Sequence, residues 1–470
     1  MTTDTVATRT VDHFVDSIGR GTGVPAELFA ADAVLDATVP GWRFGVEGQQ
    51  AVAAQYSDSF AVPGTFEELE RLAVGDADVV TYLLTREEQG VPHAAPTATS
   101  SASTPAGGSR GTGSSAAAGG TLLCSPRWPP RSMLVDMHTA APSVDDLLAG
   151  AQDRRPFTNP DGRSSADFEH VRIDGVAHVV KYVHLDHDFT MRVSGDIRCR
   201  TVRAWEAGLL DCAHDFVDHA IVGAAQGWGR NGWGAALLMR DVSAELLPQR
   251  DVTIPAQQHA LFVDHLAGFC AATWGWQDRP GTGPGLLPYD ARWEWFGPAA
   301  LEGERALGWP ERVPKVADEG WRRFDERAPA DVVGIIEALR PDVTPLTAAL
   351  RRTPSCFLHG DVKASNTGRA ADGRALLIDW AYVGEGPACH ELAWHLALDR
   401  SRLPVSKEAT ADAFRVALER HGVDTSTWWD VQLRLCLLGA LVQFGWEKAL
   451  GDDDELMWWC DAAREGAAWL

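Results

Sequence analysis

A low-complexity stretch in the first third of the chain most constrains how these 470 residues can fold. Residues 95–120 read APTATSSASTPAGGSRGTGSSAAAGG and consist almost wholly of Ala, Ser, Thr, Gly and Pro. Such a segment has no large apolar side chain to bury, so it predicts a disordered linker. A chain of this length is also too long to fold around a single compact core. We therefore predict a first domain (1–92), a disordered linker (93–136) and a larger second domain (137–470).

The charge balance limits the kinds of partner that the protein can have. Acidic residues outnumber basic ones by 65 to 42, which gives a formal net charge of -23. A field of that sign repels nucleic acid and anionic membranes, so we expect neither as a partner. No protein partner is evident from the sequence. The acidic surface either favours a cationic substrate or only keeps the protein soluble.

Cysteine usage and the N-terminus indicate the compartment. The 8 cysteines form no CxxC pair and have no matching histidine spacing. This pattern argues against a zinc ribbon or a disulfide framework and fits a reducing cytosol. The N-terminal MTTDTVATRTVDHF lacks the basic and apolar regions of a signal peptide. The apolar stretch HALFVDHLAGFCAATWGW is interrupted by Asp264 and His265. We expect a soluble, cytoplasmic protein.

The first domain mixes helical and strand-like patterns. EGQQAVAAQYSDSF is helical, and the second half of GTFEELERLAVGDADVVTYLLTREE has strand character. This order resembles the start of the NTF2-like, SnoaL-type fold, which needs further long strands where the linker begins. We expect an incomplete module without chemistry. The alternative is a small-molecule isomerase or hydrolase that uses acids such as Asp32 or Asp36. Met133 and Met137 prompt a second hypothesis, in which a frameshift joins two reading frames.

The second domain changes from strands to helices along its length. FEHVRIDGVAHVVKYVHL predicts two strands joined by a type I′ turn at Asp174-Gly175. WGAALLMRDVS reads as a buried strand, and most of the following chain is helical. The pattern predicts a sheet-rich small lobe (137–242) and a helical large lobe (243–470), with a cleft between them.

Three polar residues stand at the edges of otherwise apolar segments. Asp361 and Asn366 lie in CFLHGDVKASN, and Asp379 ends RALLIDW. The turn signal ADGRA between them predicts that the two apolar strands pair and bring their polar ends together. Mg²⁺ held by a carboxylate and an amide oxygen, beside a second carboxylate that accepts a proton, needs these residue types. The alternative is that the aspartates only cap turns at strand ends.

The pattern HGDVKASN followed by LLIDW resembles the aminoglycoside phosphotransferase and choline kinase-like family, which shares the protein-kinase fold. The resemblance implies ATP and Mg²⁺. It makes Asp361 the catalytic base, Asn366 a metal ligand and Asp379 the chief metal ligand, while His359 orients the loop. Lys363 either contacts the transferring phosphate or is an exposed loop lysine.

The same resemblance implies nucleotide-binding residues upstream. Lys181 of HVVKYVH would hold the α- and β-phosphates, since a lysine in a buried strand requires an anionic partner. Glu206 of RAWEAGLL would pair with it, unless Glu206 is only a charge on a helix surface. Backbone around Met239 to Asp241 would bind adenine, although a core strand followed by a turn would look the same.

The loop that would cover the phosphates precedes Lys181. In NPDGRSSADFEHV, Gly162, Ser164 and Ser165 offer backbone and hydroxyl donors, although a full G-x-G-x-x-G pattern is missing. Farther along, Glu391 in GPACHELAWHL fills an acidic position that the family uses for structure.

The predicted fold class is therefore α+β, a two-lobed protein-kinase-like fold preceded by an incomplete NTF2-like domain and a disordered linker. The predicted function is transfer of the γ-phosphate of ATP, with Mg²⁺, to a hydroxyl of a small molecule such as an aminoglycoside, an amino alcohol or another metabolite. A catalytically inactive nucleotide-binding module is the alternative. Residues 400–470 contain several tryptophans and the acidic GDDDEL, which would suit a cationic acceptor. Alternatively, the tryptophans belong to the core and GDDDEL is a solvated turn.

Overall fold

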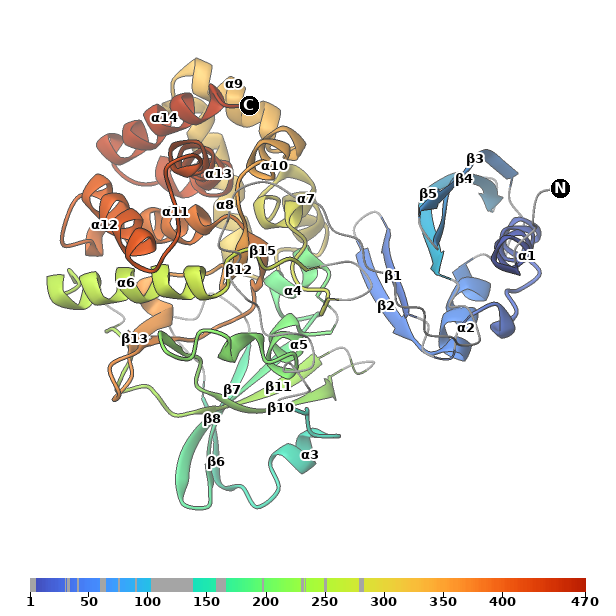
Figure 1. The fold of residues 1–470 in the computed structure, drawn as a ribbon, viewed down its shortest axis with the longest axis horizontal. Helices are drawn as coiled ribbons and strands as arrows, with labels where there is room; N and C mark the ends of the chain where they lie inside the picture. Colours follow the sequence, from blue (N-terminus) through green and yellow to red (C-terminus); the bar gives the residue numbers. More distant parts are fainter. Residues whose placement is uncertain are drawn as a thin grey trace, which may run out of the picture. The chain divides into compact units, whose positions relative to one another are not determined.

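The computed structural model describes residues 6–29, 31, 34–39, 42–59, 65–74, 77–88, 91–102, 138–157, 166–196, 198–229, 232, 234–248, 252–278 and 283–470. The chain divides into two compact units, Met1–Cys124 and Ser125–Leu470. Figure 1 labels the helices and strands of each unit. No helix among these residues combines the length and the apolar character that crossing a bilayer requires.

The first unit combines helices with two small sheets. Its elements are α1 (Val6–Arg20), the 3₁₀ helix η1 (Ala26–Leu28), β1 (Val34–Val39), β2 (Trp42–Glu47), α2 (Gln49–Ser59), β3 (Thr65–Val74), β4 (Ala77–Glu88) and β5 (Val91–Ala102). β1 pairs with β2, and β3, β4 and β5 form a second antiparallel sheet. Phe14 of α1 packs edge-on against Tyr56 of α2, with ring centroids 4.9 Å apart, in a core that belongs to this unit.

Strand β5 runs through residues that the sequence assigns to the linker. Residues 93–102 pair with β4 in a ladder that extends from Glu88↔Val91 to Ala77↔Ala102. A ladder is built from backbone groups, so a composition of small residues does not reveal it. Residues 103–136 of the predicted linker and Asp32 lie outside the described residues, and Asp36 lies on β1. The NTF2-like resemblance stays a prediction.

The second unit opens with a five-stranded antiparallel sheet in the order β10-β11-β8-β7-β6. The elements of this first part of the second unit are α3 (Val144–Leu147), β6 (Gln152–Phe157), β7 (Asp167–Ile173), β8 (Val176–His184), α4 (Phe189–Ser194), α5 (Arg200–Glu206), η3 (Leu209–Asp211), β9 (Val217–Asp218), β10 (Ile221–Trp228) and β11 (Gly234–Arg240). Asp174 and Gly175 both have positive φ, 50° and 79°, between the paired residues Ile173 and Val176. The predicted type I′ turn is confirmed.

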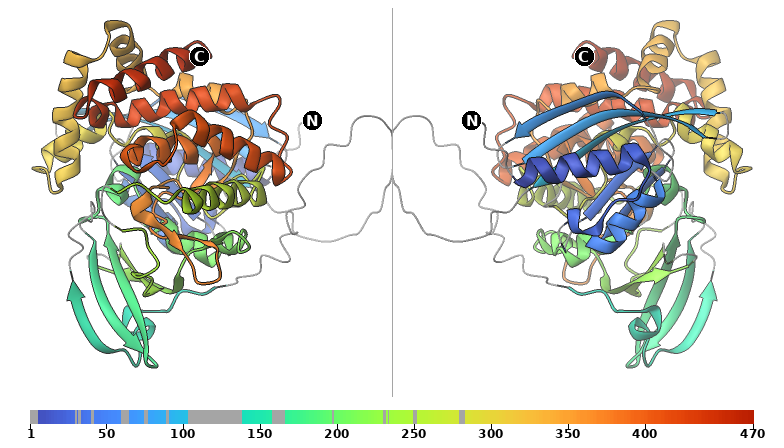
Figure 2. Two further views of the ribbon diagram at one scale, coloured as in Figure 1. Left: turned by 90° about the vertical axis from the view of Figure 1, so that its left-hand side faces the viewer. Right: turned by 90° about the vertical axis from the view of Figure 1, so that its right-hand side faces the viewer.

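Helices dominate the rest of the second unit. The elements are α6 (Ala256–Ala272), η5 (Asp290–Trp293), α7 (Pro298–Ala306), α8 (Arg312–Arg327), α9 (Ala330–Leu339), α10 (Thr344–Leu350), β12 (Cys356–Leu358), η6 (Ala364–Asn366), β13 (Thr367–Arg369), β14 (Ala375–Leu377), β15 (Gly384–Gly386), α11 (Ala388–Leu398), η7 (Arg400–Arg402), α12 (Lys407–Arg420), α13 (Trp429–Ala449) and α14 (Asp453–Ala467). The largely buried α13 packs against α8, α11 and α14. Figure 2 shows this helical lobe, in yellow to red, beside the green sheet. The predicted α+β class, with a sheet-rich lobe followed by a helical one, is confirmed.

The strand pairing around the motif differs from the prediction. The strand β14 in RALLIDW pairs with β13, which directly follows Asn366, and not with β12 in CFLHGD. β12 pairs instead with β15, downstream of Asp379. The turn predicted at ADGRA is present, with Gly373 at φ 96°. The predicted pairing of β12 with β14 was wrong. Short apolar strands such as these carry no sequence signal that identifies their partners.

Helix α4 is fastened to α7 and α8 by a buried ion network. Arg192 donates to both oxygens of Glu304, at 2.8 and 2.9 Å, and to Glu311 at 3.0 Å. Glu311 also accepts a hydrogen bond from the backbone amide of Phe189. Burial, followed by the nearby charge of Asp188, raises the pKa of Glu311 to about 7, despite the favourable contact with Arg192.

We expect Glu311→Gln to stabilise the protein by an amount that grows between pH 5 and pH 8. A carboxyl whose pKa is higher in the folded than in the unfolded state destabilises the fold when it ionises. This penalty is absent below the ordinary value of 4.5 and complete above about 7. The amide still accepts hydrogen bonds through its oxygen, so the gain at pH 8 should be about 1–3 kcal/mol. Thermal unfolding at both pH values measures it, and an equal Tm difference at both would contradict the expectation.

Candidate active site

Asp361 lies in the loop that follows β12, where its carboxylate is held from three sides. Lys363 Nζ lies 2.9 Å from Oδ1 and 2.6 Å from Oδ2, and Asn366 Nδ2 donates to Oδ2 at 2.8 Å. Trp394 Nε1 donates to Oδ1 at 2.9 Å. Asp361 is only 2% exposed, and burial raises its pKa although the Lys363 ammonium opposes the shift. A buried carboxylate beside an ammonium group is suited to accept a proton.

His359 joins this loop to the end of β14. Its Nδ1 accepts the backbone N–H of Asp361 at 3.1 Å, so Nε2 must carry the proton that it donates to the carbonyl of Ile378 at 3.0 Å. Burial lowers the pKa of His359 to about 4, so the ring is neutral. The predicted orienting role of His359 therefore has a geometric basis in these two hydrogen bonds.

Asn366 and Asp379 are brought together by the β13–β14 pair. Thr367 pairs with Leu377, and the Ile378 amide donates to the Asn366 carbonyl at 3.0 Å. Asp379 follows directly, with φ at 67°, a left-handed conformation that is uncommon for a residue with a side chain. This left-handed conformation turns the backbone at Asp379, so the side chain of Asp379 takes a direction that a continuing strand would not allow.

Lys181, on strand β8 of the small lobe, contacts Asp379 from the side of the sheet. Its Nζ donates to Asp379 Oδ1 at 2.7 Å, and Lys181 is only 7% exposed. Burial lowers the pKa of the lysine, but Asp379 and then Asp188 outweigh it, and the net shift is upward. For Asp379, burial raises the pKa, but Lys181 and Lys363 outweigh it, and the net shift is downward. The pair is therefore ionised at neutral pH.

Glu206 does not take the position predicted for it. Glu206 Oε1 accepts the backbone amide of Ala140 at 3.1 Å, and the carboxylate bonded to Lys181 is that of Asp379. The second carboxylate whose charge acts on Lys181 is Asp188, the N-cap of α4. The order of the helices suggested Glu206 of α5 as the partner of Lys181. Asp188, in the turn before the earlier helix α4, is instead the second carboxylate whose charge acts on this lysine.

A pocket between the sheet and the loop after β14 contains Lys181, Asp188 and Asp379. Met239 of β11 also lines it, and its predicted backbone contact with adenine stays a prediction. Asp241 is not part of the lining, and its carboxylate accepts from the hydroxyl and amide of Ser243. Gly162, Ser164 and Ser165, the predicted phosphate-covering residues, lie outside the described residues.

Helix α11 holds the loop of residues 359–366 near both of its ends. The buried Glu391 accepts the backbone amides of His359 and Gly360, which gives it the structural role predicted for it. Asp399, at the C-terminal end of the helix, accepts the amide of Ala364 at 2.8 Å and is bonded to His395 Nδ1 at 2.8 Å. Sequence reasoning missed Asp399 and Trp394, whose partners are 35 and 33 residues away.

The side-chain oxygens of Asn366 and Asp379 are suited to coordinate Mg²⁺. Asn366 donates through Nδ2 to Asp361, so its amide oxygen is left for another partner. Asp379 binds Lys181 through Oδ1, which leaves Oδ2. Among the described residues no group of three or more His, Cys, Asp and Glu side chains surrounds one point. Magnesium at a phosphate site takes one or two protein oxygens and fills its other positions with phosphate and water, so two donors suffice.

Gly360 permits the close approach that this loop requires. It has φ 81°, and a Cβ there would lie 2.5 Å from the Tyr382 carbonyl oxygen and 2.6 Å from Arg292 Nη1. Gly373, in the β13–β14 turn, has φ 96°, but its nearest neighbour would be Arg369 Nη2 at 3.8 Å. The two glycines share a positive φ, and only Gly360 is crowded.

We expect Gly360→Ala to lower the free energy of unfolding by about 3–5 kcal/mol, because backbone strain adds to the collision. Gly373→Ala, the control for backbone strain alone, should cost about 1–2 kcal/mol. Urea unfolding measures both differences. Equal losses in the two variants would show that crowding at Gly360 contributes nothing.

The comparison with family models identifies part of the second unit. Residues 213–424 match the phosphotransferase enzyme family. This range contains Asp361, Asn366 and Asp379, whereas Lys181 precedes it. The match confirms the family resemblance of the sequence motif for these residues of the second unit.

Solved structures provide a second comparison. Similar ones include the choline kinase LicA from Streptococcus pneumoniae, at 12% identity over 69% of this chain and 96% of that chain with a TM-score of 0.34. An ethanolamine kinase from Plasmodium vivax has 12% identity over 67% and 81% of the two chains, with a TM-score of 0.36. An aminoglycoside-3'-phosphotransferase of type VIII has 18% identity over 62% and 94%, with a TM-score of 0.34. No curated protein sequence matches the chain.

Proposed function

We propose, starting from the phosphotransferase-family domain of residues 213–424, that the protein uses ATP and Mg²⁺ to phosphorylate a hydroxyl group of a small molecule. The observation that supports this most is the contact between the two lobes at one point. Lys181 of the sheet meets Asp379, while Asp361 and Asn366 are hydrogen-bonded to each other in the adjoining loop. These are the residue types that phosphoryl transfer to an alcohol requires.

Lys181 supplies positive charge for the phosphates of the nucleotide. Its ammonium is buried, ionised and already oriented by Asp379, so little reorganisation is needed when phosphate oxygens arrive. Met239 supplies part of the apolar wall on the adenine side. When bound, Mg²⁺ would be held by the Asn366 amide oxygen and by Asp379, and would neutralise phosphate charge.

Asp361 is the proton acceptor in this proposal. The acceptor oxygen attacks the γ-phosphorus, the bond from that phosphorus to the bridging oxygen of the β-phosphate breaks, and ADP leaves. The hydroxyl proton passes to the Asp361 carboxylate, and the product is a phosphate monoester. Lys363, bonded to both oxygens of Asp361, opposes the upward shift that burial gives the pKa of this carboxyl and so favours its ionised form. The same ammonium is available to the transferring phosphate.

Incubation of the full chain with γ-³²P-labelled ATP and MgCl₂ tests the proposal. The acceptors are representative aminoglycosides, amino alcohols and neutral sugars. We expect ADP formation and a labelled product with at least one class, and loss of both on chelation of the metal. Binding of Mg·ATP without ADP formation for any acceptor would instead favour an inactive nucleotide-binding module. Failure to bind Mg·ATP would contradict the proposal.

A further inference from the structure

We propose that Trp394 is a positioning residue for phosphoryl transfer, because its indole N–H fixes the orientation of the Asp361 carboxylate. The inference rests on the proposed function. Trp394 Nε1 lies 2.9 Å from Asp361 Oδ1, and the two residues are 5% and 2% exposed. A hydrogen bond from a buried donor to a buried carboxylate is strong and directional, since water does not compete for either partner.

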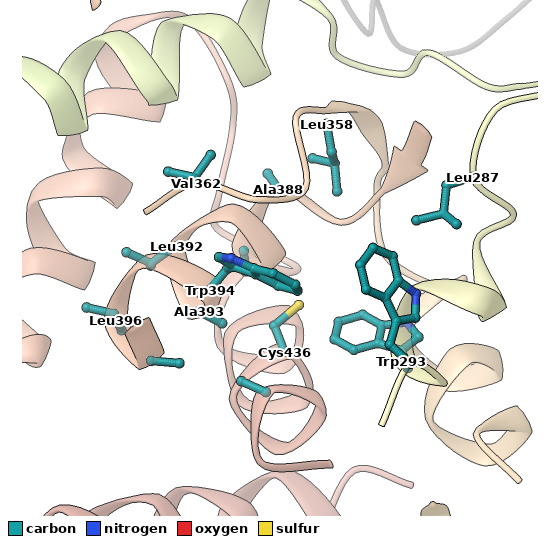
Figure 3. Close-up of a cluster of buried hydrophobic side chains, with 14 of the residues drawn as sticks. Leu287, Trp293, Leu358, Val362, Ala388, Leu392, Ala393, Trp394, Leu396 and Cys436 are labelled. Carbon is teal, nitrogen blue, oxygen red and sulfur yellow. The ribbon is translucent and has the colours of Figure 1, made fainter. Parts of the chain in front are cut away.

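The surrounding core fixes the direction in which this N–H points. Trp394 projects from α11 into an apolar cluster that includes Val362 and Cys436 (Figure 3). Its ring meets Phe444 edge-on, with centroids 4.8 Å apart and planes at 83°, and it meets Trp295 at 6.2 Å and 75°. An indole packed on several sides cannot rotate without opening a cavity. The core therefore acts as a rigid support for one hydrogen bond.

The other contacts of Asp361 come from residues that have a second task in the proposed reaction. Asn366 would also hold the metal, and Lys363 is available to the transferring phosphate. The Lys363 contact can therefore weaken when phosphate arrives, and the orientation of the Asn366 amide then depends on the metal as well as on Asp361. Trp394 has no such competing task, so its N–H holds Oδ1 in place while the acceptor hydroxyl approaches. Misplacement of a catalytic group by about 1 Å can lower a rate about a hundredfold, so such support has a measurable effect.

Trp293 provides a matched control within the same core. It belongs to the apolar cluster that Figure 3 shows, is 1% exposed, and its Nε1 has no hydrogen-bond partner among the described residues. Trp→Phe at either position removes one N–H and part of an indole from the core. Only at Trp394 does it also remove a donor to Asp361.

Steady-state kinetics of the full chain, with ATP and an acceptor that the wild type phosphorylates, test the inference. We expect Trp394→Phe to lower kcat by about 10- to 100-fold and to leave KM for ATP within about threefold of the wild-type value. Trp293→Phe should leave kcat per folded molecule within about threefold. In an Asp361→Ala background, Trp394→Phe should cause no further loss, because the two residues act as one unit. Equal kcat losses in the two tryptophan variants, or additive losses with Asp361→Ala, would overturn the inference.

A measurement without a tryptophan substitution covers the case in which Trp394→Phe does not fold. In ¹⁵N-labelled protein, the Trp394 indole N–H should exchange with solvent at least about tenfold faster in Asp361→Ala than in the wild type. The Trp293 N–H should change little, and unchanged exchange at Trp394 would also overturn the inference. A wild-type protein that transfers no phosphate would overturn the proposed function itself, whereas an Asp361→Ala variant with full activity would overturn the role of Asp361 and, with it, this inference.

Discussion

Replacing Asp361 with Asn should lower kcat by about 10²–10⁴-fold, the range that removal of a general base produces. The substitution keeps the size of the side chain, and its oxygen can still accept from Trp394, while its Nδ2 can no longer accept from Lys363 and Asn366. The amide cannot take the proton of the acceptor hydroxyl at neutral pH. Because the proposed nucleotide site relies on Lys181 and Asp379, which are bonded to each other, the affinity for Mg·ATP should change by no more than about threefold.

Calorimetric titration with Mg·ATP, combined with an ADP-release assay, separates these two effects. Asp372→Asn is the control, because Asp372 is an exposed carboxylate in the β13–β14 turn that pairs with Arg374. Its loss should leave kcat within about twofold, as expected for a surface ion pair. Normal turnover by Asp361→Asn would remove Asp361 from the mechanism, and loss of nucleotide binding would assign it to the nucleotide site instead.

The proximity of Asp361, Asn366 and Asp379 could be predicted from sequence because the chain itself brings these residues together. A short loop separates Asp361 from Asn366, and one tight turn returns the chain from β13 to Asp379. The contact between Lys181 and Asp379 joins residues 198 positions apart. Periodicity cannot predict such a contact, and the family resemblance placed Lys181 at the phosphates without pairing it with Asp379.

The incorrect predictions also have physical causes. β15 consists of Gly384, Glu385 and Gly386, a composition that is unfavourable for a strand, so the partner of β12 was not recognised. Its pairing depends on the surrounding lobe, where Arg292 donates to the Glu385 carbonyl. Asp188 was missed because a carboxylate in a turn before a helix usually acts only as a cap. In both cases tertiary contacts, which the local sequence does not encode, determine the structure.

Lys181→Met should weaken both the fold and the binding of nucleotide. Removal of the ammonium leaves the partly buried Asp379 carboxylate without its partner and the buried Asp188 without the nearest opposing charge. Loss of one partner from a buried pair costs about 3–5 kcal/mol of folding free energy. Loss of a preorganised cation at the phosphates should lower kcat/KM for ATP by about 10²–10³-fold. Urea unfolding and initial-rate kinetics at several ATP concentrations measure the two losses.

The matched control is Lys407→Met, which breaks another lysine–carboxylate pair of the second unit. Lys407 Nζ lies 2.6 Å from Glu455 Oε2, between α12 and α14, and it takes no part in the Lys181 pocket. This variant should lose about 1–2 kcal/mol of stability, because Glu455 keeps the hydrogen bond from Trp459 Nε1 and the nearby Lys448 ammonium, and it should keep normal kinetics. If Lys181→Met lost stability but bound ATP normally, Lys181 would be a structural counter-ion for Asp379 rather than a phosphate ligand. Normal stability with weak ATP binding would instead show that Asp188 and Asp379 tolerate each other without the ammonium between them.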